Sequence, residues 1–88
     1  MKSYVKVYFS YFEYGEDDFV PCECCTKRAN DIHHILNRKR RSDLLNNIIN
    51  LMALCRECHT KYGDKNQWIE FLQSKHNQFM KNHGKHKL

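Results

Sequence analysis

The stretch Asn30-Asp31-Ile32-His33-His34-Ile35 decides the fold, because it sets two adjacent histidines between two pairs of cysteines. The first pair is Cys22-x-x-Cys25, and the second is Cys55-x-x-Cys58, which is followed directly by His59. Thiolates and imidazoles are the side chains that bind zinc and related divalent ions best. The pattern therefore predicts two metal sites, one built from sulfur and one from imidazole.

The two cysteine pairs predict a structural zinc ion. A spacing of two residues lets both sulfurs of a pair reach one ion at about 2.3 Å. Residues 26–54 separate the pairs, a longer gap than the roughly 15–20 residues of simple zinc ribbons, so a separate unit is looped out between them. Cys24, inside the first pair, is predicted to be a free thiol.

The length of the chain also favours a metal. With 88 residues, we expect a single domain over 1–88, which buries only about 60% of its unfolded surface and needs a staple. The charged N-terminus does not read as a signal peptide, and no apolar run is long enough to span a membrane. We therefore expect a cytoplasmic protein, in which thiolates bind metal and do not form disulfides.

Charge is distributed unevenly along the chain. Residues 1–25 carry two lysines and five acidic side chains, a net charge of −3, whereas residues 26–88 carry 13 basic and 5 acidic side chains, a net charge of +8. A basic body of this kind suits a nucleic acid. The run Arg38, Lys39, Arg40 and Arg41 is predicted to lie along DNA phosphates, and the alternative is a solvated turn.

Local patterns predict the elements on both sides of the histidines. Residues 4–14, rich in aromatic and β-branched side chains, predict a strand, and 15–18 an acidic, solvated turn. Residues 31–36 and 51–54 predict a β-hairpin joined by a long basic loop, and a helix should run from Cys55 to Tyr62 with Gly63 just past its end.

A second helix is predicted at about 65–81. Asp64 and Gln67 have the spacing of a capping box, and an apolar stripe follows at helical intervals. His76 lies on that stripe and is expected to be packed and not to bind metal. The tail, residues 82–88, is polar and expected to be frayed.

The histidines predict a division of labour. Neighbours on a strand point to opposite faces, so a shared site requires the strand to end there. One imidazole can then bind an ion while the other, with an ordinary pKa near 6.5, accepts a proton. His59, next to the zinc-fixed Cys58, can complete the ion site with His33; the alternative is that His33 and His34 are only packed or surface side chains.

These residues in this order resemble the HNH endonuclease family, in its zinc-containing form found stand-alone in phages and bacteria. The resemblance covers about residues 20–62 and implies a small α+β protein with a ββα-metal (His-Me finger) core, to which the predicted N-terminal strand and C-terminal helix are added. It implies that His33 and His59 bind a catalytic divalent ion and that His34 is the general base. Asn50 is the asparagine of the family signature and would tie the loop to the hairpin so that His34 stays oriented.

The resemblance implies a DNA phosphodiester hydrolase in a bacterial or phage-infected cell. Its cofactors would be structural zinc at Cys22, Cys25, Cys55 and Cys58 and a catalytic Mg, Mn, Ni or Zn ion. Its partner would be DNA and not a membrane, and a homodimer or a DNA-processing partner of phage or host stays open. Two alternatives remain: a zinc module that binds nucleic acid without cutting it, and a protein-interaction zinc domain.

Overall fold

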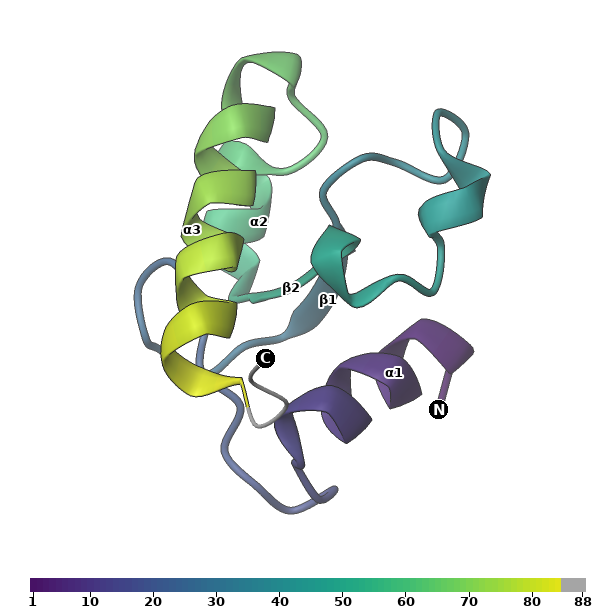
Figure 1. Ribbon diagram of the computed structural model, residues 1–88. Helices are drawn as coiled ribbons and strands as arrows, with labels where there is room; N and C mark the ends of the chain where they lie inside the picture. The colour runs from purple at the N-terminus through teal and green to yellow at the C-terminus, as the bar shows by residue number, and fades with distance from the viewer. Residues whose placement is uncertain (85–88) are drawn as a thin grey trace.

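The structure is a computed structural model that describes residues 1–84. It is a small α+β fold whose central two-stranded sheet lies between α1 and the α2–α3 side of the molecule (Figure 1). The elements follow in the order α1 (Ser3–Phe12), β1 (Asp31–His34), η1 (Ser42–Leu44), η2 (Ile48–Asn50), β2 (Leu51–Leu54), α2 (Arg56–Tyr62), η3 (Asn66–Trp68) and α3 (Ile69–His83), in which η marks a short 3-10 turn. None of the described helices is long and apolar enough to cross a bilayer.

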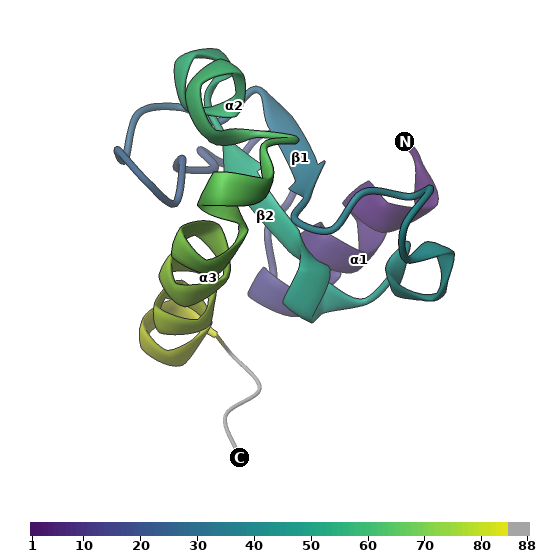
Figure 2. The same cartoon turned by 90° about the horizontal axis from the view of Figure 1, so that it is seen from above.

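The predicted hairpin is confirmed. β1 and β2 pair antiparallel, with His33 opposite Met52 and His34 opposite Leu51. All four residues of β2 are buried, because the strand is covered on both faces (Figure 2). Alternation along the strand divides it between two clusters: Met52 and Leu54 pack with the cysteines and α3, whereas Leu51 and Ala53 pack against α1.

The N-terminal strand predicted over 4–14 is wrong, because Ser3–Phe12 form helix α1. Tyr4, Tyr8 and Phe12 recur at intervals of four and share one face of a helix. Tyr8 and Phe12 are buried in the cluster that contains Leu51 and Ala53. Packing on the hairpin therefore overrides the β preference of the aromatic residues.

The helix stops at Glu13, whose φ of 60° is left-handed and whose backbone N–H reaches the carbonyls of Phe9 and Ser10. The predicted acidic turn follows: the Asp18 carboxylate accepts a hydrogen bond of 2.6 Å from the Gly15 N–H. The Asp18 carboxylate thereby stabilises the turn itself.

The C-terminal helix forms, but its predicted cap is wrong. α3 starts at Ile69 after the η3 turn, and neither Lys65 before η3 nor Trp68 before α3 makes a side-chain cap. Asp64 instead adopts a left-handed backbone conformation, with a φ of 58°, and lies outside the helix. Of the tail expected to be frayed, residues 82 and 83 belong to α3, and 85–88 lie outside the described residues.

Candidate metal centres and active site

The four predicted cysteine ligands come together, and their sulfurs lie within 4.8 Å of one another. The Sγ atoms of Cys25 and Cys55 are 3.5 Å apart, close to the roughly 3.8 Å between sulfurs that share a tetrahedral zinc. All five cysteines are free of disulfides. The donor set and its spacing therefore fit a zinc ion.

Local structure makes this cluster. The first pair sits on a tight turn in which the Thr26 N–H donates to the Cys22 carbonyl at 2.9 Å. The second pair starts α2, where the Cys55 sulfur accepts from the Cys58 N–H, which lowers the pKa of the Cys55 thiol to about 7. Cys24 stays outside the cluster, and burial raises the pKa of its thiol to about 11. A thiolate at Cys55 is the form that binds metal.

A second group of donors forms between β1 and the end of α2. One ligand atom each from His33, His59 and Asp64 lies within 4.8 Å of the other two. His33 is 4% exposed, and its Nε2 is the one buried side-chain nitrogen or oxygen without a hydrogen-bond partner in residues 1–84. Burial, and then the nearby His59, lower the pKa of His33 to about 4, so its ring is neutral. An unpartnered ring nitrogen on a neutral imidazole, beside two further donors, fits a divalent ion.

His59 is oriented from behind by Asp31. Its Nδ1–H donates to Asp31 Oδ2 at 2.9 Å, which leaves the lone pair of the neutral ring on Nε2. Arg56 donates to the two oxygens of the same carboxylate at 3.1 and 3.3 Å. Burial raises the pKa of Asp31, but the hydrogen bonds from His59 and Arg56 outweigh it and leave the pKa below its usual value. This carboxylate–imidazole arrangement is the usual support of a metal-binding histidine.

Asp64 was missed as a candidate donor because its spacing to Gln67 suggested a helix cap. The sequence feature that could have identified Asp64 is its position directly after Gly63, at the end of the helix that carries His59. A Cβ atom on Gly63 would lie 2.5 Å from both the Cδ2 and the carbonyl oxygen of His59, and 3.3 Å from His33 Cε1. The chain thus passes so close to both imidazoles that only glycine fits without displacement.

His34 is 8% exposed and faces the same hollow as His33 because β1 ends there. Its Nε2–H donates to the Leu45 carbonyl at 2.9 Å, so Nδ1 carries the lone pair. The ring packs edge-on against Tyr4, with 4.5 Å between centroids. Burial lowers the pKa of His34, although the Leu45 bond opposes this, and a neutral imidazole results.

Asn50 is 1% exposed and joins the hairpin to the long loop. Its Oδ1 accepts from the Leu36 N–H at 2.8 Å, and its Nδ2 donates to the carbonyls of Leu36 at 3.0 Å and Leu44 at 3.4 Å. Leu36 lies two residues after His34, and Leu44 precedes the residue that binds the His34 ring. The amide therefore fixes both the strand end and the loop that hold His34.

The four residues of the predicted basic run are all exposed, but they make different contacts. Arg38 lines the hollow of about 220 Å³ that contains the histidines, and its guanidinium lies 6.0 Å from the Tyr4 ring centre. Arg40 donates to Asn66 at 3.1 Å, and Arg41 forms a two-point ion pair with Asp43 at 2.9 and 2.8 Å. Lys39 is exposed. The prediction of phosphate contact thus has most support at Arg38.

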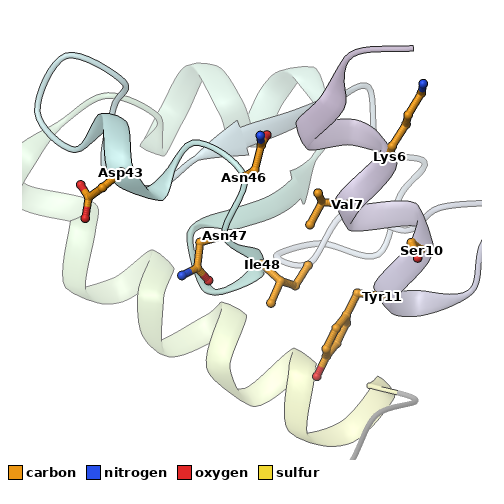
Figure 3. Close-up of a pocket in the computed structure, with 8 residues that line it drawn as sticks. All are labelled: Lys6, Val7, Ser10, Tyr11, Asp43, Asn46, Asn47 and Ile48. Carbon is orange, nitrogen blue, oxygen red and sulfur yellow. The ribbon is translucent and has the colours of Figure 1, made fainter.

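A larger hollow of about 780 Å³ lies elsewhere, between α1 and the loop with η1 and η2 (Figure 3). It is wide open, and it is lined by Lys6, Val7, Ser10, Tyr11, Asp43, Asn46, Asn47 and Ile48. No histidine or cysteine lines it, so it does not share the chemistry of the two candidate metal centres.

One comparison with known proteins gives a match. The model of the HNH endonuclease family matches residues 22–65, half of the chain. The matched range contains both cysteine pairs, the three histidines of the candidate site, Asn50 and Asp64, and it leaves out α1 and α3. No curated protein and no solved structure matches the chain.

Proposed function

The chain belongs to the HNH endonuclease family, and we propose that it is a metal-dependent endonuclease that hydrolyses the phosphodiester bonds of DNA. The observation that carries this proposal is the unpartnered, buried Nε2 of His33 beside His59 and Asp64, with His34 lining the same hollow. In this proposal β1, β2 and α2 form a ββα-metal core, and the four-cysteine cluster holds structural zinc.

His33 and His59 hold the catalytic ion in this proposal, and Asp64 is a third donor. A divalent cation held by these residues would supply Lewis-acid stabilisation of the negative charge that develops during phosphodiester hydrolysis. Two imidazoles and one carboxylate suit Mn, Ni or Zn better than Mg, which prefers carboxylates and water. Asp31 holds His59 with Nε2 free for the ion.

His34 is the general base. Its Nδ1 takes a proton from the attacking water, whose oxygen bonds to phosphorus as the bond to the 3′ oxygen breaks and that oxygen takes a proton from solvent. The Leu45 carbonyl fixes the tautomer that this step needs. Asn50 positions His34 through the strand end and the loop. Arg38, in the same hollow, binds a phosphate oxygen of the substrate.

The test is the cleavage of supercoiled plasmid with Mg, Mn, Ni or Zn by the parent protein, His33→Ala and His34→Ala. His34→Ala should bind the ion and DNA but cut about 10²–10⁴-fold more slowly, the usual worth of a general base. His33→Ala should bind the ion weakly, which calorimetric titration measures, and a higher ion concentration should restore part of the cutting.

Two results would change the proposal. If His34→Ala loses the ion and His33→Ala keeps it, the two roles are exchanged. If the parent binds DNA but cuts none in any ion, the non-catalytic zinc module replaces the nuclease.

A further inference from the structure

Three buried polar side chains form a network outside the histidine hollow. Glu23, between the first two cysteine ligands, accepts from the Tyr8 hydroxyl at 2.6 Å and from the Ala53 N–H at 3.2 Å through Oε2. Its Oε1 lies 2.7 Å from His76 Nδ1, and the side chains of Glu23 and His76 are both 0% exposed. The network joins α1, the first cysteine turn, β2 and α3. Groups buried so completely are costly unless every bond is made, and here each has its partners.

The outer end of the network is the Ile48 carbonyl. His76 Nε2 lies 2.6 Å from this oxygen and must carry a hydrogen, because a carbonyl only accepts. The same oxygen also accepts from the Leu51 N–H. Both of its acceptor positions are therefore used, one by the backbone and one by a side chain from α3, more than 25 residues away in the chain.

Ile48 starts the η2 turn that ends at Asn50. The Asn50 amide holds Leu36, just past His34, and Leu44 in the loop. A short path of hydrogen bonds thus runs from His76 through one turn of backbone to the residue that orients the proposed base. The family match includes Glu23, Ile48 and Asn50 but leaves out Tyr8 and His76, so two of the three buried side chains of the network come from α1 and α3, outside the matched range.

We infer that Glu23 and His76 are positioning residues of the proposed nuclease, which hold the Ile48–Asn50 turn so that Asn50 keeps His34 oriented. This inference rests on the function proposed above. Neither residue lines the hollow, so neither touches substrate or ion. Burial, and then the Glu23 charge, raise the pKa of the Tyr8 hydroxyl, which therefore stays a donor and anchors the carboxylate.

Two substitutions of His76 separate its two hydrogen bonds. His76→Asn places an amide N–H near the position of Nδ1, so it keeps the Glu23 bond and loses the Ile48 bond. His76→Gln places an amide N–H near the position of Nε2, so it keeps the Ile48 bond. Both variants replace the ring by a smaller amide, so loss of packing affects them alike. Zinc content and thermal melting measure that common loss.

We expect kcat for plasmid cleavage to fall about 10–100-fold in His76→Asn, with KM for DNA unchanged, since a displacement of about 1 Å in a site costs on the order of 100-fold. His76→Gln should recover most of that loss. If kcat per folded molecule is the same in both variants and the parent, the inference is overturned. Equal losses in the two variants that follow melting would likewise overturn it and leave a structural role.

A measurement without cleavage keeps this inference separate from the proposed function. The side-chain amide of Asn50 gives its own pair of ¹H–¹⁵N signals, and its hydrogens should exchange faster with solvent in His76→Asn than in His76→Gln or the parent. If the His76 variants are too unstable, Tyr8→Phe removes the hydrogen bond from the Tyr8 hydroxyl to Glu23 with little loss of volume. This variant should also shift the Asn50 side-chain amide signals. Unchanged Asn50 signals in a folded variant refute the network, whereas a parent that never cuts refutes only the nuclease.

Discussion

Gly63→Ala should damage the histidine site although it replaces none of the donor residues. The new Cβ would lie 2.5 Å from His59 Cδ2 and from the His59 carbonyl oxygen, where ordinary contact begins near 3.4 Å. The His59 carbonyl oxygen belongs to the backbone of α2 and cannot move independently of the helix. The clash is therefore removed by a shift of the His59 ring or of the Asp64 backbone by up to about 0.9 Å. Overpacking of this kind typically costs about 1–3 kcal/mol of stability.

The effect on function should be larger than the effect on the fold. A displacement near 1 Å at a catalytic site costs on the order of 100-fold in rate, and disturbed support of a ligand costs about 10–100-fold in metal affinity. Calorimetric titration with Mn or Ni and plasmid cleavage measure the two losses. Zinc content should stay at the parent level, because no sulfur lies among the three atoms nearest to the new Cβ.

Gly15→Ala is the matched control. There the new Cβ meets nothing closer than Asp18 Oδ2 at 3.5 Å, an ordinary contact. It should leave metal binding and cleavage unchanged. If Gly63→Ala binds the ion and cuts like the control, the close packing of this backbone against the two imidazoles does not hold the site together.

Three further predictions follow from the contacts of the site. Cys55→Ser should remove a zinc ligand and unfold the domain, whereas Cys24→Ser should keep both zinc content and melting temperature; zinc loss from the second variant would mean that the wrong thiol is assigned. Arg38→Ala should make the slope of log affinity for DNA against log salt shallower by about 1, whereas Arg41→Ala, whose guanidinium is engaged in an ion pair, should change it less; equal slopes in the two variants would contradict this. Asp31→Asn should weaken the catalytic ion by about 10–100-fold in calorimetric titration at unchanged zinc content, and parent-like affinity would show that His59 needs no support.

Much of the central unit could be predicted from local spacing. The spacing of two residues favours binding of one ion by both cysteines of a pair. The run of four apolar residues before Cys55 favours a short strand that pairs with the strand carrying the histidines. The free thiol of Cys24, the hairpin and α2 can all be predicted from such local constraints, which act between residues close together in the sequence. Helix α2 is also predictable because the second cysteine pair starts it and Gly63 ends it.

The remaining features depend on contacts between distant parts of the chain. Residues 3–12 satisfy both strand and helix periods, and only the apolar face of β2 selects the helix. Asp64 has the spacing of a cap, yet a left-handed backbone turns it to His33 and His59. The partners of Glu23 lie 15 to 53 residues away, in α1, β2 and α3. Short-range pattern determines which ligands this protein offers, whereas long-range packing determines which side chains hold them, because a buried polar group takes its partner from whatever the fold places beside it.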